Sequence, residues 1–305
     1  LDLANDSALV QLNQTAQQFA KYQWSAAPMG EHIQTNEAVA PQSIINPARH
    51  SDVVGYVQEA TTEQVEQALN NAQAVQDIWA RTAKDTRASY LLRAADLMEA
   101  RLEELMVLLC RESGKTYANA IAEVREAVDF LRYYATQMID LDANAEVEPL
   151  GTMLCISPWN FPLAIFTGQV AAALVAGNTV IAKPAEQTPL IAAQAIQILW
   201  QAGVPQAAVQ LMPGRGETVG AQLSAAEQVQ GIMFTGSTEV AKILQKTVAK
   251  RLSKNGESIP LIAETGGQNA MIVDSSALTE QVVLDVVSSA YDSAGQRCSA
   301  LRVLC

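Results

Sequence analysis

Cys298 is the best candidate for a nucleophile in this sequence. It stands in the run AGQRCSA, where Gly295 would leave the thiol accessible and Arg297 adds a positive charge that favours the thiolate. Cys110 and Cys155 lie within apolar helix-like and strand-like patterns, which is typical of core thiols. A purely structural thiol is the alternative for Cys298.

Glu264 has the position expected of a general base. It follows the apolar residues 260–263 and precedes Thr265 and two glycines, so its carboxylate would stand at a strand end that a ligand can approach. An isolated glutamate is more often a surface residue, and both interpretations stay open.

Asn160 lies at the centre of the turn SPWNFP, which follows an expected strand. Two prolines and a tryptophan make the turn stiff, and the neutral amide of Asn160 could donate a hydrogen bond to a ligand. Alternatively, Asn160 caps the helix that follows the turn.

Three further runs could contact a nucleotide. Lys183 and Glu186 stand at the end of another expected strand, where they could hold the hydroxyls of a ribose or form a solvated surface pair. Gly236 leads into a helix whose first turn carries Ser237, so free amides could meet a pyrophosphate, with an ordinary helix cap as the alternative. The run PGRGETVGA misses the G-x-G-x-x-G fingerprint, because valine stands where the third glycine is needed.

These residues need a scaffold, and the second half of the sequence predicts one. From residue 150 short apolar runs alternate with helical stretches, which indicates an α/β fold with a parallel sheet covered on both faces. The expected strands are 152–156, 179–182, 209–212, 231–234 and 260–263. The expected helices are 163–175, 188–202, 217–225 and 237–252. Ligands of such sheets bind at the carboxyl ends of the strands, where several of these candidates stand.

The first half of the sequence predicts helices behind an entry segment. Residues 1 to about 40 are polar and irregular, and we expect a linker with one helix around 9–22. Thr61 and Gln64 form a capping box that starts a helix. The other expected elements are a β-like run at 53–57 and helices near 85–112 and 116–140.

Composition and charge exclude several classes of protein. Of the 305 residues 49% are apolar and 17% are charged, so general disorder is excluded. The net charge of −12 opposes binding to nucleic acid or to an anionic membrane surface. No apolar run reaches the roughly 18 to 20 residues of a membrane helix, and the first residues lack a signal-peptide pattern, so we expect a cytoplasmic protein.

The cysteines and histidines favour neither a disulfide framework nor a metal site. The four cysteines include no CxxC pair, and the two histidines, His32 and His50, both lie near the beginning of the sequence. The last residues, SALRVLC, read as a strand that stops without a turn or polar tail, and AMIVDSS opens a new strand near Asn269. We therefore expect that the sequence is a fragment of a longer protein. A second domain would begin near Asn269 and be incomplete in this fragment.

The order and spacing of these motifs resemble the NAD(P)-dependent aldehyde dehydrogenase superfamily. The motifs are ISPWNFP, KPAEQTP, FTGSTEVAK and ETGG, with Cys298 thirty-four residues after Glu264. The runs INPARHSDVVGYVQEA, IAEVREAVDFLRYYATQ, AKPAEQTPLIAAQ, LMPGRGETVGAQL and DSAGQRCSALRVLC look like the aldehyde dehydrogenase module of the bacterial bifunctional proline-catabolic flavoenzymes, proline utilization A. The resemblance extends from about residue 40 to the end.

The resemblance implies both an activity and an organisation. In that family the module oxidises L-glutamate γ-semialdehyde, the hydrolysed form of Δ1-pyrroline-5-carboxylate, to L-glutamate. The implied parts are a linker at 1–40, a doubly wound, Rossmann-like NAD-binding domain at 41–268 and the start of a truncated catalytic domain at 269–305. An upstream proline dehydrogenase domain, absent from this chain, would carry FAD, and the parent protein would be a homo-oligomer. The piece itself is expected to bind NAD weakly and to turn over little substrate.

The resemblance also implies catalytic roles. The Cys298 thiolate would attack the aldehyde carbon, and the Asn160 amide would hold the resulting oxyanion together with the Cys298 backbone N–H. Glu264 would then activate the water that hydrolyses the thioester. The implied substrate contacts are Phe161, Arg297 and Ser299.

The same motif matching implies an NAD site. Its residues are Ile156, Ser157, Pro158, Trp159, Lys183, Glu186, Gly216, Gly220, Phe234, Thr235, Gly236, Ser237, Val240, Thr265 and Gly266. A free Glu186 carboxylate would repel the 2′-phosphate of NADP, so NAD is the expected cofactor.

Three alternatives stay open. The chain could belong to an aldehyde dehydrogenase for another small aldehyde, or it could be a non-catalytic NAD-binding fragment. A cysteine hydrolase using Cys298 would need a general-base histidine, and the two histidines both lie in the N-terminal segment.

Overall fold

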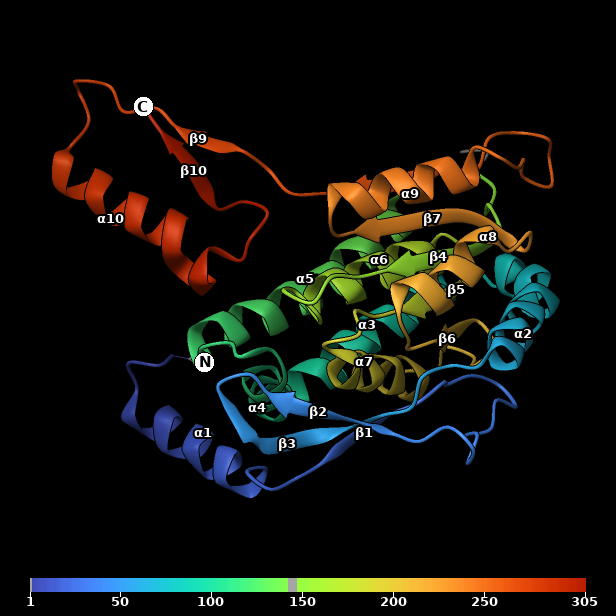
Figure 1. Cartoon of the computed structure of the whole chain (residues 1–305), viewed down its shortest axis with the longest axis horizontal. Coiled ribbons are helices and arrows are strands. Elements are labelled where there is room, and N and C mark those ends of the chain that lie inside the picture. Colours follow the sequence, from blue (N-terminus) through green and yellow to red (C-terminus); the bar gives the residue numbers. More distant parts are fainter. Residues whose placement is uncertain (1, 142–146) are drawn as a thin grey trace.

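The computed structural model describes residues 2–141 and 147–305. At its centre lies a five-stranded sheet in the order β6–β5–β4–β7–β8, and every neighbouring pair of strands is parallel (Figure 1). The strands are β4 (Thr152–Ile156), β5 (Thr179–Lys183), β6 (Val209–Leu211), β7 (Val229–Thr235) and β8 (Leu261–Glu264). The predicted parallel α/β sheet is confirmed, and each strand lies within one or two residues of its expected range.

The direction of the strand order reverses beside β4. From β4 the chain moves outward through β5 to β6, returns to the other side of β4 with β7, and continues outward to β8. Such a reversal opens a crevice at the carboxyl ends of the two strands beside it, which is where doubly wound sheets bind their ligands. Here those ends are Ile156 of β4 and Thr235 of β7.

Both faces of the sheet are buried. Met153 and Cys155 of β4 belong to one apolar cluster, and Leu154 belongs to the cluster on the other face, as the two-residue period of a strand requires. The covering helices that follow the strands are α6 (Ala164–Val175), α7 (Pro189–Gln201), α8 (Ala221–Ala225) and α9 (Thr238–Val248). The α-helix expected over 217–225 is shorter, because its first part is a wider π-helical turn at Gly216–Gly220.

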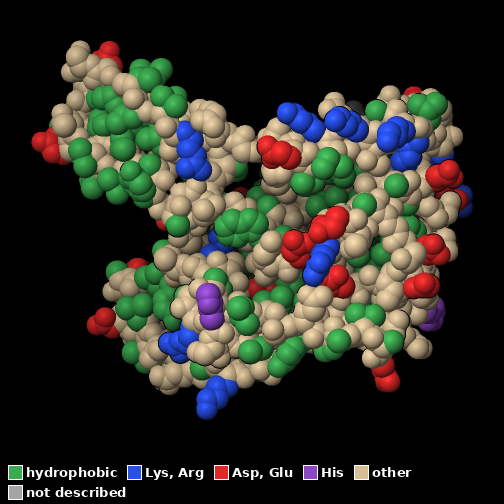
Figure 2. Space-filling view, viewed as in Figure 1, with side chains coloured by type: hydrophobic (Ala, Val, Ile, Leu, Met, Phe, Trp, Pro, Cys, Tyr) green, Lys and Arg blue, Asp and Glu red, His purple; other side chains and the backbone are tan. Residues whose placement is uncertain are grey.

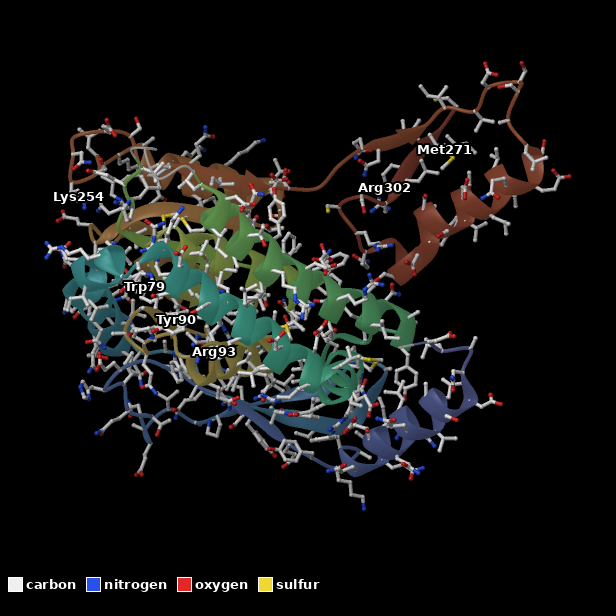
Figure 3. The ribbon with its side chains drawn as sticks, turned by 180° about the vertical axis from the view of Figure 1, so that it is seen from behind. Trp79, Tyr90, Arg93, Lys254, Met271 and Arg302 are labelled. Atoms are coloured by element: carbon white, nitrogen blue, oxygen red, sulfur yellow. The ribbon has the colours of Figure 1, made fainter. Side chains whose placement is uncertain are left out.

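Helices that precede the sheet in sequence pack against it or against the helices that cover it. They are α2 (Thr62–Arg81), α3 (Lys84–Ala100), α4 (Leu102–Ser113) and α5 (Tyr117–Asp140). The predicted capping box of Thr61 and Gln64 is present at the start of α2. Trp79 of α2 donates its indole N–H to the Leu174 carbonyl of α6 at 3.1 Å and stacks on Tyr90 of α3 (Figure 3). These contacts join the helical region to the helices of the sheet.

The prediction of a single helix over 85–112 is wrong. The chain divides it at Arg101 into α3 and α4. The Arg101 guanidinium donates to the Glu104 carboxylate at 2.7 and 2.9 Å and to Gln194 of α7 at 2.6 Å. Both helices bury apolar side chains in the same cluster, so the apolar spacing continues across the break and does not reveal it.

The segment before residue 40 is not the irregular linker that its composition predicts. Its first helix is capped by Asn5, and the side chains of Leu12 and Trp24 are buried. A three-stranded sheet forms when β3 pairs in parallel with β1 and in the antiparallel sense with β2. The elements are α1 (Asp6–Gln18), β1 (Trp24–Ala26), β2 (Gln42–Asn46) and β3 (Arg49–Val57). This segment is therefore packed against the rest of the chain.

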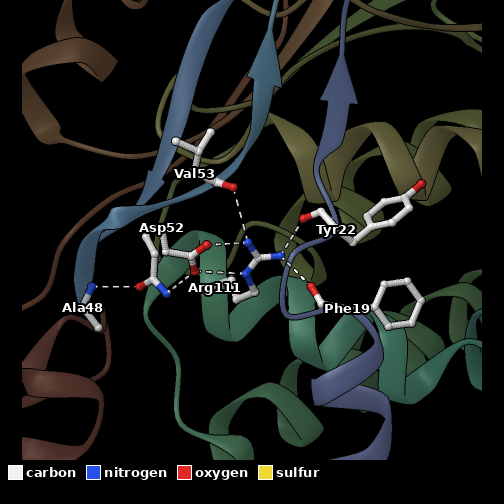
Figure 4. Close-up of polar contacts among 7 residues, drawn as sticks. Phe19, Tyr22, Ala48, Asp52, Val53 and Arg111 are labelled. Atoms are coloured by element: carbon white, nitrogen blue, oxygen red, sulfur yellow. Dashed lines mark hydrogen bonds and ion pairs between the residues drawn. The ribbon is translucent and has the colours of Figure 1, made fainter.

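Arg111 of α4 holds this segment in place (Figure 4). Its guanidinium donates to the carbonyls of Phe19 at 2.8 Å and Tyr22 at 2.7 Å, and to the two Asp52 carboxylate oxygens at 2.6 and 3.1 Å. It also lies over the ring of Trp24, 5.3 Å from the centroid. The hydrogen bond from Arg111 lowers the pKa of Asp52. One buried arginine thus joins three segments that are distant in sequence.

Residues after Glu264 form a small unit that stands apart from the sheet (Figure 1). It contains β9 (Asn269–Met271), α10 (Thr279–Tyr291) and β10 (Leu301–Leu304), with β10 parallel to β9. None of the α10 side chains is buried, and apolar side chains gather on the surface of this unit (Figure 2). Within the described ranges, no helix combines the length and the apolar character needed to cross a membrane.

Candidate active site

A cavity of about 520 Å³ lies where the strand order reverses, and it contains the candidate nucleophile. Loops after β4, β7 and β8 form its walls, and the turn before β10 closes one side with Cys298. The predicted site residues that line it are Ile156, Ser157, Pro158, Trp159, Asn160, Phe234, Thr235, Gly236, Ser237, Val240, Thr265, Gly266, Arg297 and Cys298. These predicted residues come from four separate segments of the sequence, which meet here.

A second cavity, of about 790 Å³, adjoins the first. The two share Ile156 and Val240 as lining residues, so they follow one another along the carboxyl edge of the sheet. Of the other predicted residues, Lys183, Gly216 and Gly220 line this second cavity. Together the two cavities form an elongated site that reaches from Lys183 to Cys298.

Asn160 points toward the cysteine segment. Its side-chain amide donates to the Gln296 carbonyl, two residues before Cys298, at 2.9 Å. The alternative role of Asn160 as a helix cap is wrong, because α6 begins without a local side-chain cap. The buried Glu123 of α5 takes that role, since its carboxylate accepts from the backbone N–H groups of Leu163 at 2.8 Å and Ala164 at 3.3 Å.

The Cys298 segment is held by side chains that the sequence did not indicate. Asn269 donates its amide to the carbonyls of Cys298 at 2.7 Å and Ala300 at 3.1 Å. Arg302 donates to the Gly295 carbonyl at 2.9 Å (Figure 3). The Cys298 side chain itself is exposed. The backbone of the nucleophile segment is thus fixed while the thiol is accessible.

Arg297 and Phe161 form a charged and aromatic group beside the cysteine. Arg297 donates to the Asp292 carboxylate at 2.8 Å, so part of its charge is already neutralised, and its guanidinium lies 5.8 Å from the centre of the Phe161 ring. Lys115 lies over the same ring at 4.5 Å and forms an ion pair with the buried Glu123 at 2.8 Å. Phe161 therefore contacts two cations. Ser299, the third predicted substrate contact, is exposed.

Glu264 ends β8 beside the cavity. Its backbone carbonyl accepts from Gly236 N at 3.1 Å, which joins the ends of β7 and β8, and its side chain is exposed. Thr265 and Gly266 line the cavity, whereas Glu264 is not among the described lining residues. The carboxylate is adjacent to the site, and its catalytic role stays a prediction.

Lys183 is buried and does not form the solvated surface pair considered above. Its ammonium donates to the Pro184 carbonyl at 3.0 Å, and burial lowers its pKa while Glu186, Glu59 and Glu217 oppose that shift. Glu186 is exposed and lines a third hollow next to Lys183. A buried ammonium beside carboxylates is a good hydrogen-bond donor for hydroxyls.

Ser237 caps α9, as the simpler interpretation predicted. Its hydroxyl accepts from Val240 N at 3.2 Å, and the first turn of the helix lines the cavity. The cap leaves other first-turn amides free for a ligand. Neither His32 nor His50 is among the described lining residues, so the hydrolase alternative has no histidine base at Cys298. In the described ranges, no group of three or more His, Cys, Asp and Glu residues could hold a metal ion.

This fold and site agree with the result of comparison with known families. The sequence pattern of the aldehyde dehydrogenase family matches residues 33–305, so the chain belongs to the aldehyde dehydrogenase family.

Individual relatives show which members of this family the chain is similar to. The bifunctional protein PutA of Escherichia coli strain K12 is 62% identical over 305 residues, which are 100% of this chain and 23% of that protein. The 1-pyrroline-5-carboxylate dehydrogenase of Anoxybacillus flavithermus is 36% identical over 309 residues, 97% of this chain and 59% of the relative. A crystal structure of 1-pyrroline-5-carboxylate dehydrogenase from Thermus with bound NAD matches with a TM-score of 0.93 at 34% identity. The match covers 100% of this chain and 61% of the chain in that crystal structure. The chain spans less than a quarter of the length of that PutA protein.

Proposed function

We propose that this chain is part of an NAD-dependent dehydrogenase that oxidises L-glutamate γ-semialdehyde to L-glutamate in proline catabolism. The observation that carries the proposal is the meeting of Asn160 and Cys298 in one cavity, with the Asn160 amide bonded to the cysteine segment. The names of the relatives, PutA and 1-pyrroline-5-carboxylate dehydrogenase, support this substrate over another small aldehyde.

The residues of the elongated site fit an NAD molecule. The second cavity would hold the adenosine, with Lys183 and Glu186 on the ribose hydroxyls, and the first turn of α9 would meet the pyrophosphate. Ser157 lines the first cavity with a buried hydroxyl that has no hydrogen-bond partner among the described residues, as expected where a polar ligand group completes the site. When bound, NAD would supply the hydride acceptor that the oxidation requires.

The chain's own residues can perform the covalent steps. The Cys298 thiolate adds to the aldehyde carbon, and the negative charge that forms on the oxygen is stabilised by the Asn160 amide and the Cys298 backbone N–H. After oxidation, a thioester links the substrate to Cys298. Glu264 accepts a proton from water as the water attacks this thioester, which releases L-glutamate and the thiolate.

Substrate selectivity would come from the group around Phe161. The semialdehyde carries a carboxylate, and Arg297 is a cation that lines the cavity and lies beside Phe161. Ser299 could add a hydroxyl donor. An uncharged aldehyde such as propanal gains nothing from these groups.

We further propose the wider setting that the family resemblance implies. The chain would follow a proline dehydrogenase domain that carries FAD, in a homo-oligomeric cytoplasmic protein, and the chain alone would turn over little. These features belong to the whole protein. The E. coli PutA protein is more than four times as long as this chain.

The test is NADH formation from glutamate semialdehyde, measured by absorbance in this chain and in a polypeptide of the relatives' full length that contains it. Cysteine-dependent NADH that disappears in Cys298→Ala supports the proposal, and propanal serves as the comparison substrate. Activity that survives Cys298→Ala, or a preference for propanal that survives Ser299→Ala, would overturn it.

A further inference from the structure

Glu186 faces a hollow of about 390 Å³ that the catalytic proposal does not use. The hollow lies between the end of β3 and the loop after β6, beside the position proposed for the adenosine ribose. Its charged lining residues are Glu59, Glu186, Glu217 and Arg215. Among the described lining residues, Arg215 is the one cation.

Arg215 is already paired with Glu59. The Arg215 Nε and a Glu59 carboxylate oxygen are 3.6 Å apart, with side-chain exposures of 57% and 24%. Glu59 in turn accepts from the Gln42 amide at 3.3 Å, so its carboxylate is oriented from β2. The arginine charge is therefore partly neutralised before any ligand arrives.

The chemistry of the hollow bears on the choice between NAD and NADP. NADP differs by a phosphate on the 2′-oxygen of the adenosine ribose, and a free arginine is the side chain best suited to bind such a phosphate. Here a 2′-phosphate would meet Glu186 and Glu217, and it would have to compete with Glu59 for Arg215. The repulsion by the two carboxylates and the competition for Arg215 each disfavour binding of the 2′-phosphate.

We propose that Glu59 is a specificity-determining residue that disfavours NADP by occupying Arg215. This inference rests on the proposed function, which places the ribose at Lys183 and Glu186. It goes beyond that function because the preference for NAD over NADP was attributed above to Glu186 alone. Glu59 follows β3, more than a hundred residues before Glu186, so the first β-sheet of the chain contributes to the cofactor choice.

The experiment measures the affinities of this chain for NAD and NADP by titration calorimetry at low ionic strength. In Glu59→Gln the carboxamide keeps the size of the side chain and frees Arg215, so the ratio of NADP affinity to NAD affinity should rise about fivefold. In the double variant Glu59→Gln/Arg215→Gln this gain should disappear. Glu280→Gln, an exposed carboxylate on α10, is the control for the change in net charge.

The outcomes separate this inference from the proposed function. No NAD binding by the wild-type chain, or NAD binding that is unaffected by Lys183→Met, would overturn the cofactor site and this inference with it. A chain that binds NAD at Lys183 but shows an unchanged ratio in Glu59→Gln would overturn the role of Glu59 alone. An equal gain in Glu280→Gln, or a gain that persists in the double variant, would also overturn it.

Discussion

Asn160 and the segment that carries Cys298 are far apart in the sequence, and a hydrogen bond of 2.9 Å from the Asn160 amide to the Gln296 carbonyl joins them. The Asn160 amide has two N–H groups, and one of them is used by the Gln296 carbonyl. In the proposed mechanism the second N–H would donate to the oxyanion formed at Cys298. Asn160 therefore aligns the Cys298 segment, and we propose that it also supplies a donor for the reaction.

Replacing Asn160 by alanine should remove both functions. We expect kcat for semialdehyde oxidation in the full-length protein to fall about a hundredfold to a thousandfold, as for loss of one oxyanion donor. Steady-state NADH formation measures the effect. The alkylation rate of Cys298 by iodoacetamide is the control for an intact thiol, and a kcat within a few fold of wild type would contradict the role of Asn160.

At the scale of elements, two buried glutamates replace local helix caps. Glu123 caps α6, as described above, and Glu112 of α4 accepts from the backbone N–H groups of Leu190 at 2.7 Å and Ile191 at 3.0 Å in the first turn of α7. Neither helix has a side-chain cap of its own. The helices before the sheet thus supply the capping groups that α6 and α7 lack.

Glu112 predicts a dependence of stability on pH. Burial raises the pKa of its carboxyl group to about 8 from an ordinary value of 4.5. Between these values the folded chain retains a proton that the unfolded chain has lost, so the contribution of Glu112 to stability is fully present below this window and is lost as the pH rises through it. The slope is at most about 1.4 kcal/mol per pH unit.

Urea unfolding of the chain and of Glu112→Gln at several pH values tests this expectation. The glutamine releases no proton, so the free energy of unfolding of the wild type should decline relative to that of the variant between about pH 5 and about pH 8. Glu63→Gln, at an exposed position of α2, is the matched control. Parallel pH curves for wild type and Glu112→Gln would show that Glu112 keeps its ordinary pKa.

Arg111 predicts a local opening of the N-terminal segment. In Arg111→Met the carbonyls of Phe19 and Tyr22 and the half-buried Asp52 lose their partner, so we expect a loss of about 3 kcal/mol in the free energy of unfolding. Trypsin should cut after Lys21 faster than in the wild type, because this residue lies between the two released carbonyls.

The matched control for that prediction is Arg93→Met. Arg93 lies over the ring of Tyr90 at 5.4 Å, and none of its described contacts reaches the N-terminal segment (Figure 3). Its loss should leave cleavage after Lys21 unchanged. Equal rates of cleavage in the wild type and in Arg111→Met would mean that the packing of α1 and β1 holds the segment without the arginine.

At the scale of the whole molecule, burial is unevenly distributed. All five residues of β5 are buried, whereas α10 has no buried residue. Amide hydrogen exchange monitored by mass spectrometry should therefore be fastest in α10 and slowest in β4 and β5, since local opening costs least where few apolar contacts are made. Protection of α10 equal to that of β5 would contradict this ranking.

Local sequence patterns predicted the central sheet well. A buried parallel strand is a short continuous apolar run, and such runs marked the positions of β4 to β8 to within one or two residues. The same reasoning failed at Arg101, where an apolar face continues across a helix break, and before residue 40, where a polar composition conceals the buried Trp24.

The amino-acid sequence by itself thus determined the α/β class, the strands of the main sheet and the family motifs that mark the site. Only the tertiary structure decided the partners: Gln296 for Asn160, Asn269 for the Cys298 carbonyl, Glu123 for the start of α6 and Glu59 for Arg215. The physical reason is the distance along the sequence over which each kind of interaction acts. Apolar periodicity acts between neighbours along the chain, whereas these hydrogen bonds and ion pairs join residues far apart in sequence, and their partners become defined only when the strands and helices pack together.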